Sequence, residues 1–315
     1  MNDLYALSQL IKALPFYSVH RDEIHHLYRL LAQNSELHAE GLLNKLKEHF
    51  PEVFLILQKN HELFKKHCTE SQRMSEQGVR LICYGEENFP KLCYWMADPP
   101  LTLMYWGEPA WNKAECLSVV GSREPSFESV QWLEKEFAPF CDSVKPNIVS
   151  GGARGVDQKA HSTALRKNLS TVIVLPSGLG VLYPDSLREW IGPVLDQGGS
   201  FLSEYAFEQK MHKHLFHHRN RMIAALGKVT LLVEARRRSG TLITAQQALA
   251  LGRPVWVVPG HPLDPHFSGS LDLLTEGAQL IRDAQDLTMY FNSEMNSIKA
   301  SPAGLARAAT EQHYL

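Results

Sequence analysis

Short β-rich apolar runs that alternate with amphipathic stretches constrain this chain most strongly, and they begin at Cys116. We expect strands at 117–120, 147–150, 171–175, 200–203, 229–233, 255–258 and 279–281, with helices near 126–141, 156–168, 184–197, 214–227 and 241–251. Strands that are buried on both faces and joined by helical crossovers predict an α/β fold with a doubly wound parallel sheet. Such sheets bind ligands at the carboxyl ends of their strands.

The chain before this pattern is different. Residues 1–77 carry apolar residues at helical spacing and no convincing strand, which predicts a small all-α domain. A short strand at 79–84 and a bridge rich in proline and aromatic residues lead into the sheet domain, which we expect to span 78–290. The Ser/Ala-rich remainder, 291–315, is predicted to be a C-terminal tail that is too short for a further domain.

Composition excludes several classes of protein. Of the 315 residues, 44% are hydrophobic and 21% are charged, as in an ordinary soluble globular protein. The apolar runs fall short of the ~20 residues that a transmembrane helix needs, and the first residues lack the pattern of an export signal. The five cysteines are scattered without a C-x-x-C pair, which favours reduced thiols and a cytoplasmic protein.

Charge is distributed unevenly along the chain. The net charge of −2 excludes a wholesale polyanion binder, but residues 201–260 hold nine basic residues against three acidic ones. Such a local patch suits an anionic ligand. The basic residues are Lys210, Lys213, Arg219, Arg221, Lys228, Arg236, Arg237, Arg238 and Arg253.

Three turns between a predicted strand and a predicted helix have the composition of anion sites. They are Gly121-Ser122-Arg123, Gly151-Gly152 and Ser239-Gly240-Thr241. Glycine lets the backbone approach a ligand, and the following helix start supplies free N–H groups. None is a G-x-G-x-x-G or a P-loop motif, so a dinucleotide or ATPase site is unsupported.

The segment 213–227 places a cation, an aromatic ring and an amide on one helical stripe, as Lys213, Phe216 and Asn220. An aromatic residue among cations is typical of proteins that hold single strands, although Phe216 could equally be a core residue. Arg219 and Arg221 cannot point the same way, and we expect Arg221 to pair within the fold while Arg219 meets the ligand.

Other polar residues favour structural roles. Glu234 lacks a second carboxylate or a nucleophile nearby, so we expect it to cap backbone N–H groups rather than act in catalysis. The histidines at 212, 214, 217 and 218 lack cysteine or acidic partners at suitable spacing, so we expect no metal site. The run of arginines at 236–238 could follow a nucleic-acid backbone or form a solvated rim.

Taken in order, these segments resemble the DNA-processing protein A family (DprA, also called Smf) over about residues 79–285. The matching pieces are VGSREPS from Val120, SGGARGVDQKAH from Ser150, LPSGLGVLYP from Leu175, SEY from Ser203, FHHRNRMIAALG from Phe216, VEARRRSGTLITA from Val233, GRPVWVVPG from Gly252 and EGAQLI from Glu276.

The resemblance implies an extended Rossmann-like domain, preceded by a sterile-alpha-motif-like (SAM-like) module. It also implies a homodimer that binds single-stranded DNA and passes it to the RecA recombinase in natural transformation. This chain departs from the family at Gly269-Ser270-Leu271, where members tend to read G-[ST]-N. It also lacks a helix-hairpin-helix glycine signature and the length for a C-terminal winged helix.

We therefore predict a non-enzymatic DNA-binding protein without a cofactor. Its predicted DNA-binding residues are Gly121, Ser122, Arg123, Gly151, Gly152, Lys213, Phe216, Arg219, Asn220, Ser239, Gly240 and Thr241. The alternative is a nucleotide N-glycosidase of the lysine-decarboxylase-like group, whose P-G-G-x-G-T loop is followed by a glutamate that this chain lacks. A third interpretation is a recombination mediator that binds only protein partners.

Overall fold

The computed structural model describes residues 2–34, 36, 38–112 and 115–300, so the part of the predicted tail at 301–315 lies outside the described residues. The described residues up to 77 form helices and no strand, as predicted. Amphipathic spacing explains why: α3 turns Ile24, Leu27, Tyr28 and Leu31 inward on one face. The helices of this part are α1 (Asn2–Ala13), α2 (Pro15–Val19), α3 (Arg21–Gln33), α4 (Ala39–His49), α5 (Pro51–Lys59) and α6 (His61–Glu76).

A nine-stranded sheet follows, in the order β1-β2-β6-β5-β4-β3-β7-β8-β9. Strands β3 to β9 pair in parallel, whereas β2 pairs antiparallel with both β1 and β6. The strands are β1 (Arg80–Cys83), β2 (Thr102–Gly107), β3 (Cys116–Val120), β4 (Asn147–Ser150), β5 (Thr171–Val174), β6 (Ser200–Ser203), β7 (Val229–Leu232), β8 (Val255–Val257) and β9 (Gln279–Leu280).

The predicted α/β class and all the expected strands are confirmed, with one omission. Strand β2 lies in the stretch that we expected to be an irregular bridge. The prolines and aromatic residues around it obscure the pattern of a short strand. Its antiparallel pairing with β6 adds an edge hairpin to a sheet that is otherwise parallel, so the sheet is mixed rather than purely parallel.

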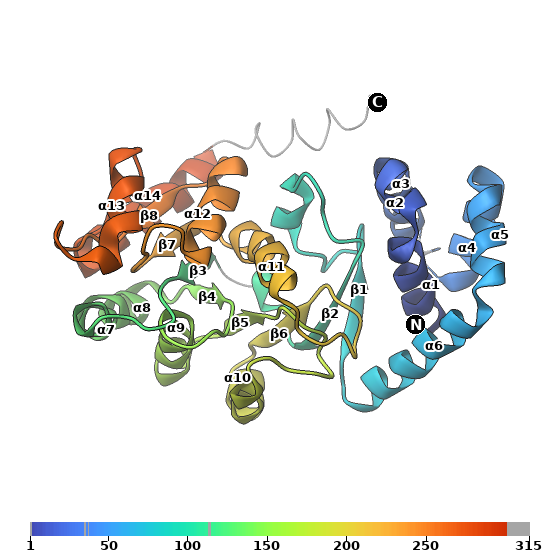
Figure 1. Ribbon diagram of the computed structural model, residues 1–315, viewed down its shortest axis with the longest axis horizontal. Coiled ribbons are helices and arrows are strands. Elements are labelled where there is room, and N and C mark those ends of the chain that lie inside the picture. Colours follow the sequence, from blue (N-terminus) through green and yellow to red (C-terminus); the bar gives the residue numbers. More distant parts are fainter. Residues whose placement is uncertain (1, 35, 37, 113–114, 301–315) are drawn as a thin grey trace.

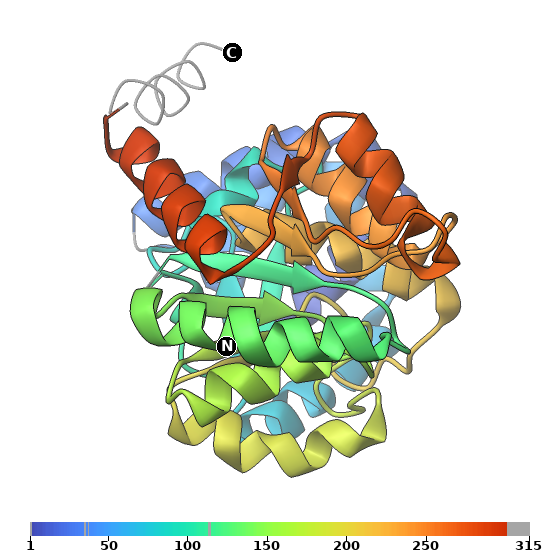
Figure 2. The same cartoon turned by 90° about the vertical axis from the view of Figure 1, so that its left-hand side faces the viewer.

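Helices cover both faces of the sheet, as a doubly wound fold requires (Figures 1 and 2). One face packs against α8 (Ala138–Val144), α9 (Val156–Arg166) and α14 (Ala284–Ala300) around Leu117, Val119 and Leu231. The other face packs against α11 (Lys213–Leu226), α12 (Gly240–Ala250) and α13 (Ser268–Thr275). Helices α7 (Phe127–Trp132) and α10 (Ile191–Asp196) complete the layers.

The C-terminal boundary differs from the prediction. Helix α14 continues to Ala300, and Phe291 and Met295 are buried in the core, with the Phe291 ring 5.7 Å from that of Phe140. Residues 291–296 are therefore part of the packed structure rather than a tail. Within the described part of the chain, none of the helices has the length and apolar character needed to cross a bilayer.

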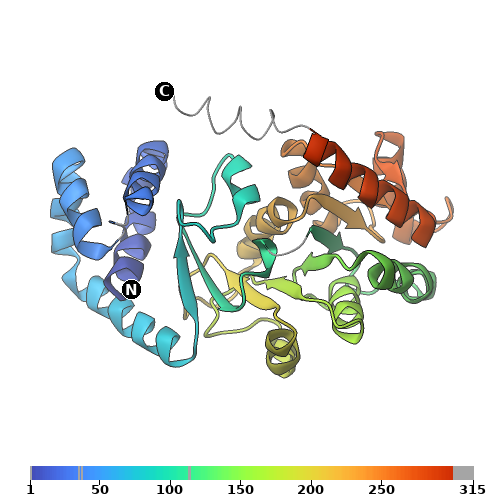
Figure 3. The same cartoon turned by 180° about the vertical axis from the view of Figure 1, so that it is seen from behind.

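The helices α1–α6 lie beside the β1–β2 edge of the sheet (Figures 1 and 3). Apolar residues of α1 belong to the same buried cluster as Leu103 of β2, and the Phe207 N–H donates to the Tyr5 hydroxyl at 2.9 Å. The division at residue 77 into two domains stays a prediction. These contacts join the helical part to the sheet. Phe207 lies in the segment that precedes α11, the helix with Lys213 and Phe216.

Candidate nucleic-acid interface

The first two glycine loops form one tightly packed unit at the carboxyl ends of β3 and β4. The Val156 N–H donates to the Ser122 carbonyl at 3.0 Å. Gly155 has a φ of +84°, and a Cβ there would lie 2.3 Å from the Ser122 oxygen. A Cβ on Gly121 would lie 2.5 Å from Val156. Glycine at both positions lets the two loops approach each other.

The third loop joins the same unit. The Ser239 hydroxyl accepts from the Thr241 N–H at 3.1 Å and so caps α12. The Thr241 hydroxyl donates to the Gly121 carbonyl at 2.9 Å, and the Asn220 amide donates to the Gly240 carbonyl at 3.3 Å. The three predicted turns and α11 therefore meet at one edge of the sheet.

A cation and an aromatic ring face each other at this edge. The Arg123 guanidinium carbon lies 4.9 Å from the centre of the Phe216 ring, within the range of a cation–π contact. Arg123 is exposed and Phe216 is half-buried, so Phe216 is not a core residue. Lys213 begins α11 one turn before Phe216 and is exposed.

Tyr183 completes the aromatic surface, and sequence reasoning missed it. Its ring meets the Phe216 ring edge to face, with centres 5.5 Å apart, and the residue is 39% exposed. The signal was present in the LPSGLGVLYP segment, where an aromatic residue follows the carboxyl end of β5. Nothing in the sequence indicated that this ring would reach α11.

The structure contradicts the prediction that Arg219 meets a ligand. Only 3% of the residue is exposed, and its guanidinium donates to the Gly151 carbonyl at 2.7 Å and to the Val174 carbonyl. A Cβ on Gly151 would lie 2.4 Å from that guanidinium. Arg219 therefore supports the second glycine loop: one guanidinium nitrogen donates to the two backbone carbonyls, and its Nε–H donates to the Asn220 side chain at 3.3 Å.

Burial also shifts the pKa values of this support. Burial lowers the pKa of Arg219 to about 10, and it raises the pKa of the neighbouring Asp157 carboxyl to about 6, against the opposing charge of Arg219. Asp157 accepts from the N–H groups of Gly151 and Ala153 at 3.2 and 3.3 Å. The shape of the second loop therefore depends on a buried cation and a buried carboxyl together.

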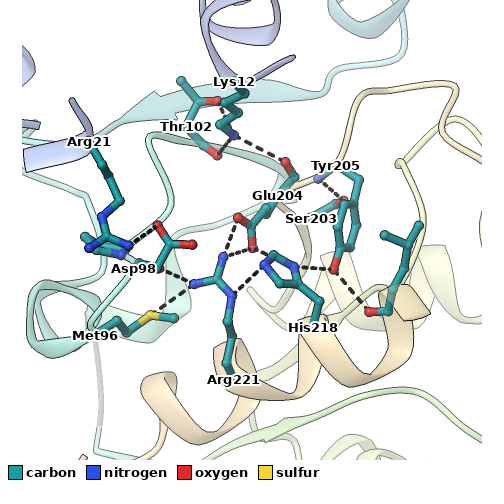
Figure 4. A network of polar contacts seen from close by, with 12 residues as sticks. Lys12, Arg21, Met96, Asp98, Thr102, Ser203, Glu204, Tyr205, His218 and Arg221 are labelled. Carbon is teal, nitrogen blue, oxygen red and sulfur yellow. Dashed lines mark hydrogen bonds and ion pairs between the residues drawn. The ribbon is translucent and has the colours of Figure 1, made fainter. Parts of the chain in front are cut away.

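Arg221 pairs within the fold, as predicted, and it anchors α11 (Figure 4). Its guanidinium donates to both carboxylate oxygens of Glu204, at 2.5 and 2.6 Å, and to the Asp98 carbonyl. The Lys12 ammonium of α1 reaches the Glu204 carbonyl at 3.5 Å and the Thr102 hydroxyl at 3.1 Å. Burial lowers the pKa of Lys12. One acidic residue thus connects the helical part to α11.

His218 takes part in the same network in its neutral form. The Arg221 Nε–H donates to His218 Nε2 at 3.2 Å, so this nitrogen is the acceptor. The Tyr205 hydroxyl donates to the Leu215 carbonyl at 3.1 Å and accepts from His218 Nδ1 at 3.0 Å. Burial lowers the pKa of His218, which favours this neutral arrangement.

Glu234 has the capping role that we expected. It is fully buried, and one carboxylate oxygen accepts from the Ser126 N–H and the Ser129 hydroxyl, both at 2.8 Å. Ser126 is the N-cap of α7. The carboxylate therefore holds the start of that helix and does not reach the open edge of the sheet.

The histidines do not gather into a metal site. His212 and His214 stack with ring centres 5.9 Å apart, but the described residues contain no group of three or more histidine, cysteine or acidic side chains able to hold a metal ion. His218 belongs to the Arg221 network instead. His212 and His214 are thus exposed surface residues on either side of Lys213 in the sequence.

Fold and site together define a Rossmann-like α/β protein with a cation–aromatic surface at the carboxyl edge of its sheet. The family model of DNA recombination-mediator protein A matches residues 80–292. The chain belongs to this family, which confirms the resemblance seen in the sequence. The match begins at β1, so helices α1–α6 lie outside it.

Curated relatives agree with the family model. The chain is 36% identical over 197 residues to the DNA processing protein DprA of Streptococcus pneumoniae, an alignment that covers 62% of this chain and 68% of the relative. It is 34% identical over 217 residues to Protein Smf of Escherichia coli, covering 68% of this chain and 57% of the relative. The chain thus spans little more than half the length of the Escherichia coli protein.

Two solved structures share the fold. The X-ray structure of DprA from Streptococcus pneumoniae superposes with a TM-score of 0.65 at 27% identity, covering 87% of this chain and 97% of that one. A structure of DNA processing protein A from Helicobacter pylori, described for its single-stranded DNA binding mode, has a TM-score of 0.60 at 29% identity. It covers 69% of this chain and 96% of that one.

Proposed function

We propose that this chain binds single-stranded DNA at the carboxyl edge of its sheet and acts as a recombination mediator rather than as an enzyme. The observation that carries the proposal is the Arg123 guanidinium over the Phe216 ring, at the rim of three glycine loops. Family membership and the relative from Helicobacter pylori that binds single-stranded DNA support it. The predicted glycine-loop residues and Asn220 would shape the same surface.

The proposed site divides its work between two physical effects. Arg123 and Lys213 would neutralise phosphates and release counterions, which makes the affinity fall steeply with salt. Phe216 would stack on a base, which contributes about 1–3 kcal/mol with little sequence preference. A paired duplex hides its base faces, so single strands should bind better than duplexes.

The wider role is proposed from the family. We infer that the protein acts as a homodimer in the cytoplasm, protects incoming strands and loads RecA onto them during natural transformation. The family resemblance supports each of these points. If the protein bound only protein partners, the exposed Arg123 and the half-buried Phe216 would have no common role.

The N-glycosidase alternative finds little support. Hydrolysis needs an acid or base beside the ligand, whereas Glu234 is fully buried and one of its carboxylate oxygens is taken up by Ser126 and Ser129. Helix α12, which includes Thr241, has no acidic residue in its first turn. Release of ribose from a nucleoside monophosphate would favour this alternative, whereas retention of an intact oligonucleotide would favour DNA binding.

The proposal is tested by titrating the protein into a fluorescein-labelled deoxythymidine oligomer at several salt concentrations. The oligomer is used as a single strand and as a duplex with the complementary deoxyadenosine oligomer. Arg123→Ala and Lys213→Ala should weaken binding and flatten its dependence on salt, by about 0.7 in the log–log slope per lost phosphate contact. Phe216→Ala should weaken binding about 5- to 150-fold with little change in slope. Wild-type affinity in Arg123→Ala and Lys213→Ala alike would refute the proposed site.

A further inference from the structure

Three arginines occupy the ends of three adjacent strands. Arg154 follows β4, Arg123 follows β3 and Arg238 follows β7, and the sheet order places β4, β3 and β7 side by side. Val120 of β3 pairs with Leu232 of β7, the last residue of each strand, so these two loops leave the sheet at the same level. Neighbouring strands lie roughly 4.8 Å apart, which sets the three loops in a row.

Arg154 and Arg238 differ from the other arginines of these loops because their charge is not used within the fold. Both are exposed, and among the described residues neither side chain makes a hydrogen bond or an ion pair. Arg237, in contrast, forms a two-pronged ion pair with Asp272 at 2.6 and 2.8 Å. The arginine run at 236–238 therefore contains paired and unpaired members.

The backbone of Arg238 adds a second observation. Its φ is +61°, in the left-handed region that residues with a side chain rarely adopt. Glycine or asparagine would take this conformation at lower cost, by about 1 kcal/mol. Such outliers concentrate at binding sites, where the fold holds a residue in a costly conformation that serves the ligand.

We propose that Arg154 and Arg238 extend the site on either side of Arg123, so that the row binds successive phosphates of one DNA strand. This inference rests on the proposed function and deepens it. The strand crosses the ends of β4, β3 and β7, while Phe216 stacks on a base from the side of α11. Arg154 and Arg238 contribute affinity that depends on charge and not on sequence.

The test measures the salt dependence of binding to a fluorescein-labelled deoxythymidine oligomer for Arg154→Ala, Arg238→Ala and the double variant. Each single change should reduce the log–log slope by about 0.7, the value for one phosphate on a single strand, and the double change by about twice that amount. Arg237→Ala is the matched control, because it removes an arginine that Asp272 already neutralises, and its slope should equal that of the wild type.

The possible outcomes separate the two proposals. If the wild type does not bind the oligomer, the proposed function itself fails. If the wild type binds but Arg154→Ala and Arg238→Ala keep the full slope, only the arginine row is overturned. A loss in Arg237→Ala as large as that in Arg238→Ala also overturns it, because the effect then follows net charge rather than position.

Discussion

Replacing Arg219 by methionine tests whether this buried arginine is a support for the second glycine loop. Methionine keeps much of the volume but loses the donors to the Gly151 and Val174 carbonyls. It also removes the positive charge that opposes the rise in the pKa of Asp157, a residue that is only 8% exposed. A buried acceptor left without a partner costs about 1–3 kcal/mol, so the two carbonyls predict a loss of about 2–6 kcal/mol in the free energy of unfolding at about pH 8.

The loss should shrink in acid. The pKa of Asp157 is about 6 in the folded protein against a usual 3.8, so its ionised form is disfavoured and its contribution to stability falls as the pH rises from about 4 to about 6. Without Arg219 that pKa rises further, and the variant loses about 1.4 kcal/mol more at high pH for each added unit. Near pH 5 the carboxyl is largely protonated in both proteins.

His161 acts in the same direction. Burial, with a smaller effect from Arg219, lowers its pKa to about 3, so the protein loses stability as the pH falls below the usual histidine value of 6.5. Removing Arg219 eases protonation of His161 and spares the variant part of this loss. The difference in stability between wild type and variant should therefore be smaller near pH 5 than near pH 8.

Urea unfolding at the two pH values measures both effects, with Arg154→Met as the control. Arg154 is exposed, so its replacement should change the free energy of unfolding by less than about 0.5 kcal/mol. A loss below about 1 kcal/mol in Arg219→Met, or an equal loss at both pH values, would contradict the supporting role.

Three further changes probe other parts of the site. Gly155→Ala should lower the free energy of unfolding by about 2 kcal/mol or more, because the φ of +84° and the close backbone oxygen leave no room for a Cβ. Gly192→Ala is the control: a Cβ there meets nothing within 4 Å, so its urea midpoint should equal that of the wild type. Glu204→Gln should cost about 3 kcal/mol because the largely buried Arg221 loses its carboxylate partner, and unchanged thermal stability would count against the anchor. Glu124→Gln removes an exposed acid next to the proposed phosphate contacts and should strengthen oligomer binding about twofold, so weaker binding would place the DNA elsewhere.

Local sequence information was enough for most of the elements. Buried strands and glycine turns are encoded by neighbouring residues, so the residue pattern alone locates β3 to β9 and the loops at Gly121, Gly151 and Gly240. Strand β2 escaped because it lies among prolines and aromatic residues that carry no clear alternation, and its pairing with β6 joins residues far apart in the chain. The extension of α14 past residue 290 escaped for a related reason, since Phe291 is fixed by packing against Phe140.

The amino-acid sequence by itself determined the α/β class, the family and the three glycine turns at the carboxyl edge of the sheet, but not Tyr183, whose ring meets Phe216 there. Only the tertiary structure decided which cations at that edge are available. Arg219 and Arg221 lie two residues apart on α11, and both make contacts to distant segments, at Gly151 and Asp98. Arg123 remains exposed over Phe216. The sequence shows where the arginines are but not which of them can bind a ligand. That depends on the groups that surround each side chain in the fold, and many of these groups come from remote parts of the chain.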